Sequence, residues 1–321
     1  MTQVLGIVKK GKLIPQDLWV KFVNGLENDF DMSANRRAIS EQAQKSSIFD
    51  YLETNQERAK REIAEAVINA VKKRIVQKQG VLFSGGVDSS LIAFVLKKLN
   101  CNFTCYTVGI ENSDDIAWAQ KVAKEYGFNF KHKIFSLEEF EKIVKDVVKI
   151  LNDSDIVKIS VGSVLYAAGK LALSDGNDVL FGGLGSEEIF AGYQRHEEAL
   201  QRNDFENLHK ECWNGLKNMW NRDLIRDFAI AKHLGLDLRT PFLDKDLIKR
   251  AMNVHPMLKL DKENKKIILR EAAEFIGLKK EFAWRKKQAA QYGSNFVNGI
   301  EKLAKKNGFE YKKDYLQSLL H

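Results

Sequence analysis

A short run of small polar residues, Ser84–Ser90 (Ser-Gly-Gly-Val-Asp-Ser-Ser), separates an apolar stretch from an apolar helical pattern. Its two glycines can adopt backbone angles that other residues avoid, and they let a ligand approach the main chain. The helix that follows would point free N–H groups and its positive dipole end at the turn, and Asp88 could hold Mg²⁺. A ligand-free glycine turn is the alternative, but this combination favours a phosphate-binding loop. The lysine of a Walker A loop is missing, which argues against ordinary γ-phosphate transfer.

A second glycine-rich segment, Gly182–Tyr193, follows the predicted strand 178–181 and carries the adjacent carboxylates Glu187 and Glu188. A flexible turn before a helix that begins with acids would have the same composition. Ligands of parallel sheets bind at the carboxyl ends of the strands, so two such loops on neighbouring strands can face one nucleotide. Together the loops predict a site with phosphate-binding and metal-binding elements.

Both loops are similar to known motifs. Ser84–Ser90 resembles the pyrophosphate loop (PP-loop) of the N-type ATP pyrophosphatases. Gly182–Tyr193 resembles the Ser-Gly-Glu-Gly-Ser-Asp-Glu-Leu-Phe-Gly-Gly-Tyr motif of asparagine synthetases. Three later segments resemble further signatures of that family, in the same order: Leu238–Asp244, Lys266–Glu271 and Ala283–Lys287. The similarity covers about residues 60–295 and identifies the chain as similar to the synthetase domain of the asparagine synthetase family.

Family members normally carry an N-terminal glutaminase domain with a cysteine directly after the initiator methionine. This chain has Thr2 there and no cysteine before Cys101. We therefore expect no glutamine hydrolysis by this chain, and a separate glutaminase stays open as a partner. Residues 191–196 and 288–294 resemble a divergent branch, the asparagine synthetase domain-containing proteins, whose substrate is less secure.

The resemblance assigns roles to single residues. Nine would bind the nucleotide: Leu82, Ser84, Gly85, Gly86, Asp88, Ser89, Ser90, Val108 and Gly183. Asp88 and Glu187 would hold Mg²⁺, with Glu187 in place of the family's aspartate. Lys287 would neutralise charge at the α-phosphate, and it joins Asp88 and Glu187 as the implied catalytic set. Arg239 and Asp244 are expected to be structural, pairing near a proline turn.

The implied activity is that of an ATP-dependent, AMP- and pyrophosphate-forming carbon–nitrogen ligase that uses ATP and Mg²⁺. It would adenylate a carboxylate, with aspartate as the first expectation, for attack by ammonia or an amine. Leu184, however, stands where the family has the glutamate thought to take a proton from ammonia, and leucine cannot accept one. Residues 155–160 also replace polar groups implicated near the acyl substrate. Two alternatives follow: a PP-loop enzyme that modifies RNA or another macromolecule, and an ATP-binding protein with degenerate amidation chemistry.

Composition sets wider limits. The 321 residues are 44% hydrophobic and 29% charged, as in ordinary globular proteins. We expect no apolar run long enough to span a bilayer, and the three cysteines lack metal-ligand spacing. A cytoplasmic location and no membrane partner are the expectation. The net charge of +8 suits polyanions such as ATP, and it leaves nucleic acid open as a partner without favouring it.

Alternating patterns predict an α/β fold with a doubly wound parallel sheet, like the adenine nucleotide alpha hydrolase or PP-loop ATPase fold, and a C-terminal helical subdomain. The expected strands lie near residues 81–83, 104–110, 128–134 and 178–181. Residues 1–55 are expected to form a small element with a hairpin near 4–14, a helix through Leu18 and Leu26, and a polar linker at 31–47. Residues 56–321 would form the synthetase-like domain. Its nucleotide-binding core would span about 75–190 and its mostly helical part about 191–321.

Overall fold

The computed structural model describes residues 14–40, 52–202, 204–286 and 289–320. Within these ranges, five parallel strands form one sheet in the order β3-β2-β1-β4-β5. The strands are β1 (Gln79–Leu82), β2 (Phe103–Ile110), β3 (Asn129–Phe135), β4 (Val179–Phe181) and β5 (Asp237–Arg239). The chain order reverses between β1 and β4, so the carboxyl ends of these two strands flank the switch point at which doubly wound sheets bind ligands. The predicted fold class is confirmed. The strand β5 was not foreseen, because two of its three residues are charged, whereas the equally short β4 is an apolar run.

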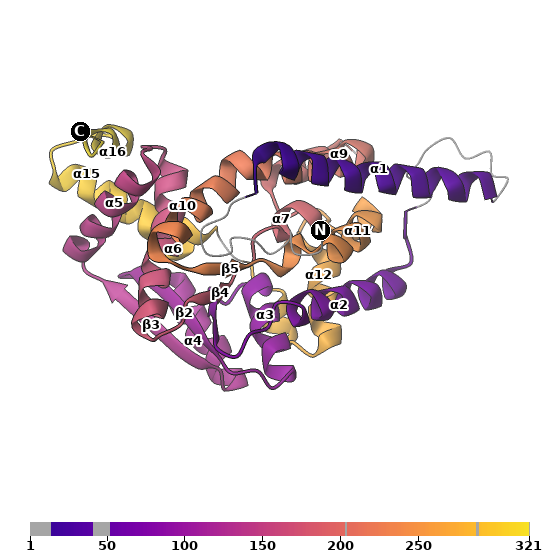
Figure 1. Ribbon diagram of the computed structural model, residues 1–321, viewed down its shortest axis with the longest axis horizontal. Helices are drawn as coiled ribbons and strands as arrows, with labels where there is room; N and C mark the ends of the chain where they lie inside the picture. Colours follow the sequence, from indigo (N-terminus) through magenta and orange to yellow (C-terminus); the bar gives the residue numbers. More distant parts are fainter. Residues whose placement is uncertain (1–13, 41–51, 203, 287–288, 321) are drawn as a thin grey trace.

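Helices cover both faces of the sheet (Figure 1). In chain order they are α1 (Gln16–Ser40), α2 (Gln56–Lys72), α3 (Val87–Lys98), α4 (Asp114–Tyr126), α5 (Leu137–Leu151), α6 (Ile156–Ser174), α7 (Ser186–Ile189), α8 (Gln194–Gln201), α9 (Phe205–Met219), α10 (Ile225–Leu234), α11 (Lys245–Asn253), α12 (Ile267–Ile276), α13 (Lys280–Ala283), α14 (Ala290–Gly293), α15 (Phe296–Lys306) and α16 (Lys312–Ser318). The π-helical turn η2 (Trp220–Leu224) and the 3-10 turns η3 (Pro241–Leu243) and η4 (Pro256–Leu258) join some of them.

The buried strand β2 divides the hydrophobic core in two. Successive side chains of a strand point to opposite faces of the sheet. Accordingly Cys105 belongs to the core shared with α2, α3 and α12, and Tyr106 and Val108 belong to the core shared with α5, α6, α10 and α15. Burial on both faces explains why β2 reads as a continuous apolar and β-branched run.

The N-terminal region differs from its prediction in one part. Helix α1 includes the predicted helix, and its side chains Trp19, Val23 and Leu26 join the first core beside α9 and α11. The predicted polar linker at 31–47 is wrong for residues 31–40, which continue α1. The polar composition of residues 31–40 led to the wrong prediction. The first turns of α1 pack on the core, and the end of such a helix can continue with few apolar residues. The hairpin predicted near 4–14, and linker residues 41–47, lie outside the described residues apart from Ile14.

Helix α6 corrects a second expectation. By length and composition it could cross a membrane, contrary to the prediction that no apolar run is long enough. In this structure 56% of that stretch is buried, and α6 packs between α5, α10, α15 and strand β2. Its hydrophobicity on all sides is that of a core helix enclosed by protein.

Two ion pairs position the family-like segment Leu238–Asp244, which contains η3. Arg74 and Asp244 are both buried, and the Arg74 Nη1 donates a hydrogen bond to the Asp244 Oδ2 at 2.9 Å. Arg239 instead pairs with Asp237, with 2.6 Å between its Nη2 and the carboxylate Oδ2. Both predicted structural residues therefore form ion pairs, but with other partners than each other. The Asp244 contact fastens the end of η3 to the C-terminal end of α2.

Replacing Asp244 by alanine should lower the free energy of unfolding by about 3–5 kcal/mol, because the buried Arg74 would lose this carboxylate. Urea denaturation measures this change. The control is Asp246→Ala, whose carboxylate is 68% exposed and pairs with Lys73, and which should leave stability nearly unchanged. Equal losses in both variants would contradict the assignment.

Candidate active site

The loop after β1 is shaped by a left-handed glycine and a serine pair. Gly85 has φ +68°, and a Cβ there would lie 2.9 Å from the backbone of residues 118 and 119 in α4. The Ser84 N–H donates to Ser89 Oγ at 3.2 Å, and the two serine hydroxyl oxygens lie 3.3 Å apart. These bonds turn the chain from β1 into α3, whose N-terminus starts beside the loop. The geometry is that expected for a phosphate-binding turn.

The loop after β4 approaches the first loop closely. A Cβ on Gly183 would lie 2.9 Å from the Cβ of Asp88, so glycine allows the two segments to meet there. Lys266 lies between them at the start of α12, with its ammonium group 2.8 Å from an Asp88 oxygen and 2.6 Å from a Glu187 oxygen. It also donates to the Ser186 hydroxyl at 3.0 Å. Although burial works against it, the pair of carboxylates holds the pKa of Lys266 above its ordinary value.

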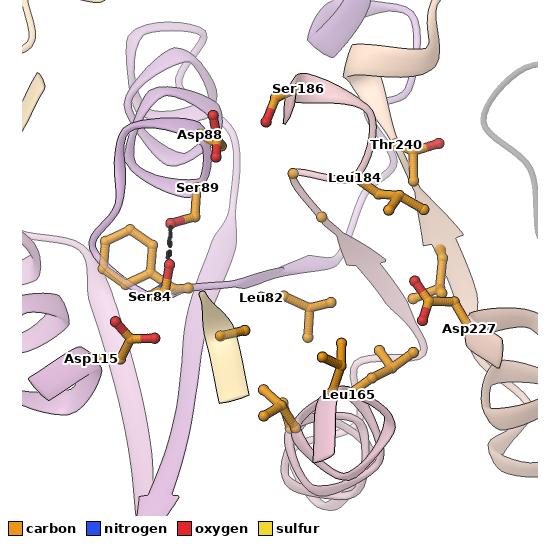
Figure 2. Close-up of a pocket in the computed structure, with 18 of the residues that line it drawn as sticks. Leu82, Ser84, Asp88, Ser89, Asp115, Leu165, Leu184, Ser186, Asp227 and Thr240 are labelled. Carbon is orange, nitrogen blue, oxygen red and sulfur yellow. Dashed lines mark hydrogen bonds between the residues drawn. The ribbon is translucent and has the colours of Figure 1, made fainter. Parts of the chain in front are cut away.

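Residues of both loops line one cavity of about 260 Å³. Figure 2 shows Ser84, Asp88 and Ser89 along one wall, and Leu184, Thr240 and Asp227 along the opposite wall. Seven of the residues implied by the resemblance line this cavity: Leu82, Ser84, Asp88, Ser89, Val108, Gly183 and Glu187. Residues from β1, from β2 and from the loop after β4 thus meet where the fold predicts a ligand.

Other implied residues lie elsewhere. Gly85 and Gly86 shape the turn without lining the cavity, and Ser90 is fully buried with its hydroxyl oxygen unpartnered among the described residues. Lys287 lies outside the described residues. The segment 155–160 forms the first turn of α6, and the cavity wall begins one residue later, at Val161.

Sequence reasoning missed three basic residues that hold the site together. Lys266 and Arg270 were used only as motif letters, and no role was given to Arg285. Arg270 Nη1 donates to the carbonyl oxygens of Ala283 at 2.6 Å and of Arg285 at 3.2 Å. Arg285 in turn donates to the Ser84 carbonyl at 2.6 Å and to Asp115 at 3.1 Å. Their place in family-like segments was the available signal, but partners far along the chain cannot be read from spacing.

The residues present fit a magnesium ion that also binds phosphate. The described residues contain no group of three or more His, Cys, Asp and Glu side chains suited to a metal. Magnesium, however, is commonly held by one or two carboxylates together with substrate phosphates. Asp88 and Glu187 offer those two carboxylates on facing loops, and the Lys266 ammonium between them indicates that this position accepts a cation.

A buried polar network lies behind Leu184. Glu188 is fully buried, accepts a hydrogen bond from the Tyr193 hydroxyl at 2.6 Å, and contacts Arg222. Burial, and then the nearby carboxylate of Asp223, raise the pKa of Glu188 to about 7. The Arg222 contact could not be predicted, because Arg222 lies 34 residues further along the chain.

Comparison with known proteins places these features in a family context. A family model described as asparagine synthase matches residues 62–207 and 201–308. A Methanocaldococcus jannaschii protein named "Putative asparagine synthetase (glutamine-hydrolyzing) 1" is 35% identical over 87% of this chain and 58% of its own length. An asparagine synthetase (glutamine-hydrolyzing) of Gallus gallus is 34% identical over 77% of this chain and 44% of its own length. The chain thus spans about half the length of the curated relatives it matches.

Similarity to solved structures is weaker. An NMN synthetase from Francisella tularensis aligns over 84% of this chain and 95% of its own, with 10% identity and a TM-score of 0.40. An NH3-dependent NAD synthetase from Campylobacter jejuni aligns over 54% of this chain and 86% of its own, with 18% identity and a TM-score of 0.32.

The Lys266 bridge makes a testable prediction about metal binding. In Lys266→Met the two carboxylates lose their shared cation, so Mg²⁺ without nucleotide should stabilise the variant more than the unchanged protein. We expect the extra shift in Tm to be about 2 °C or more, which is roughly 1 kcal/mol for a chain of this size. Thermal unfolding with and without Mg²⁺ measures it.

The matched control is Lys265→Met, because the neighbouring lysine pairs with Glu197 and not with the site carboxylates. Its response to Mg²⁺ should equal that of the unchanged protein. Identical magnesium shifts in all three proteins would mean that Lys266 does not occupy the cation position.

Proposed function

Because this chain belongs to the asparagine synthase family, we propose that it is an ATP-dependent ligase that forms AMP and pyrophosphate while joining nitrogen to a carboxylate. ATP is the nucleotide, aspartate is the first carboxylate to test, and ammonia or an amine is the nitrogen donor. The observation that carries this proposal is the meeting of two glycine loops, with Asp88 and Glu187 on either side of Lys266, inside one cavity.

The proposed reaction has two steps. A carboxylate oxygen of the substrate attacks the α-phosphorus of ATP, and the bond to the β-phosphate breaks to release pyrophosphate. The nitrogen of ammonia then attacks the acyl carbon, AMP leaves, and one proton is lost from nitrogen. Both steps depend on positioning and on stabilising negative charge.

The proposed roles follow the placement of the residues. Ser84 and Ser89 offer hydroxyl groups to the β- and γ-phosphates, and the glycines keep the main chain open beside them. Leu82, Val108 and Gly183 would contact the adenosine. Asp88 and Glu187 would hold Mg²⁺, which would supply positive charge to the phosphates, once the Lys266 ammonium group between them gives up that position.

Lys287 is proposed as the cation that stabilises charge at the α-phosphate. Arg285 lies two residues earlier and is bonded to the Ser84 carbonyl of the first loop. This bond fastens Arg285 to the phosphate-binding turn, and it supports a role there for the family-like segment that includes Lys287.

The second step has the weaker support. Leu184 lines the cavity without offering a proton acceptor. We propose that adenylation exceeds amide formation at neutral pH, and that a separate glutaminase supplies ammonia to this enzyme in the cytoplasm. Modification of RNA is the competing proposal, and its support is the net charge of +8.

Substrate-dependent pyrophosphate release tests the proposed function, and Asp88 is the decisive position. In Asp88→Asn we expect release to fall by about a hundredfold or more and Mg-ATP affinity to weaken, since a metal-binding charge is lost. Asp114→Asn is the control, because Asp114 is an exposed carboxylate at the start of α4. Unchanged release and affinity in Asp88→Asn would refute the assignment.

Lys287 and Lys286 form a matched pair for the second prediction. Lys287→Ala should lower kcat by about a hundredfold or more with little change in ATP affinity, as expected for a transition-state contact. Lys286 is exposed, and Lys286→Ala should have little effect. If both substitutions reduce kcat equally, general surface charge and not a specific lysine explains the result.

A further inference from the structure

The two sides of the cavity differ in what they can bind. Leu82 and Val108, from β1 and β2, are the positions proposed for adenosine, and the phosphate loop lies next to them. The opposite wall is formed by the loop after β4, by β5 and by α10, and Leu184, Asp227 and Thr240 face the cavity there (Figure 2). This wall is left for the carboxylate substrate.

Two carboxyl side chains that line the cavity have an oxygen without a hydrogen-bond partner among the described residues: Asp227, and Glu188 with its buried Oε2. In Asp227, Oδ1 accepts a hydrogen bond from Arg226 Nε at 2.7 Å. Its Oδ2 has no hydrogen-bond partner among the described residues, and the side chain is only 14% exposed. Burial raises the pKa of this carboxyl even though Arg226 opposes the shift. An unpartnered carboxylate oxygen on a mostly buried side chain that lines a cavity suits a ligand that donates hydrogen bonds.

The charges around this wall do not suit a second anion. Among the described lining residues on this side, Arg226 is the one cation, and it is already shared by Asp223 at 3.2 Å and Asp227. Glu188 adds a further carboxyl, and Arg222 pairs with both Glu188 and Asp223, so two arginines stand against three carboxyl groups. A second carboxylate on the substrate would meet like charges, whereas an ammonium group would meet opposite ones.

We propose that the carboxylic acid activated by this enzyme carries a protonated amine that Asp227 binds, and that it needs no second carboxylate. The inference rests on the proposed adenylation and names the substrate class of the same site. The apolar side chains of Leu184 and Leu238 line the path between the two ends of such a molecule. The substrate class is that of short amino acids whose amine lies a few bonds from the reacting carboxylate.

Three small acids separate the effect of the amine from the effect of the second carboxylate. Aspartate has an amine and a second carboxylate, β-alanine has the amine alone, and succinate has the second carboxylate alone. Glutamate, 4-aminobutyrate and glutarate form the same set with one more methylene. ATP–pyrophosphate exchange without ammonia measures the adenylation of each, independently of Leu184 and of amide formation.

With the unchanged protein, exchange should be highest for β-alanine and 4-aminobutyrate, and lower for aspartate and glutamate. For succinate and glutarate it should be at least about tenfold lower, which is the loss expected for one charged hydrogen bond. Succinate and glutarate exchanging as well as β-alanine and 4-aminobutyrate would overturn the inference while leaving adenylation intact. No exchange with any of the six acids would overturn the proposed function, and this inference with it.

Asp227→Asn keeps the shape of the side chain and removes its charge. It should reduce exchange by about tenfold or more for the four acids that have an amine. Exchange with succinate and glutarate, which have no amine, should be unchanged or improved. The control is Asp223→Asn, which removes a charge from the same network but does not line the cavity, and which should keep the order of the acids. An equal fall for all six acids in Asp227→Asn would show a structural role only and would overturn the inference.

Discussion

The two glycine loops depend on a single ammonium group. Asp88 and Glu187 come from different strands and face each other at close range, where two carboxylates repel unless a cation lies between them. Lys266 provides that cation from the start of α12, where its backbone is left-handed with φ +59°. Gly192 lies beside the pair, since a Cβ there would lie 1.6 Å from a Glu187 oxygen. Glycine at 192 therefore leaves the space that the Glu187 and Lys266 side chains occupy.

The same helix also orders the C-terminal side of the site. Arg270 on α12 holds the carbonyl groups of 283 and 285, and Arg285 then reaches the Ser84 carbonyl. Packing of α12 against α2 and α3 thus aligns both loops at once. A helix remote in sequence sets the geometry of a turn that follows the first strand.

Local patterns were enough to predict much of this fold. The strands β1 to β4 and the turn into α3 were foreseen, because apolar runs and glycine turns act over a few residues. The continuation of α1 to Ser40, the strand β5 and the Lys266 bridge were not. Each depends on contacts between segments far apart in the chain, which residue spacing does not encode. At the site, the sequence located the two carboxylates, and only the structure supplied the lysine between them and the carboxylate Asp227 opposite.

Helix α6 has a consequence for how the protein is made. The helices α10 and α15, which cover it, come later in the sequence, so its apolar surface is open while they are still being synthesised. During that interval the segment has the length and composition by which nascent chains are recognised for membrane insertion. The second core is therefore completed only after α10 and α15 have been synthesised and have packed against α6.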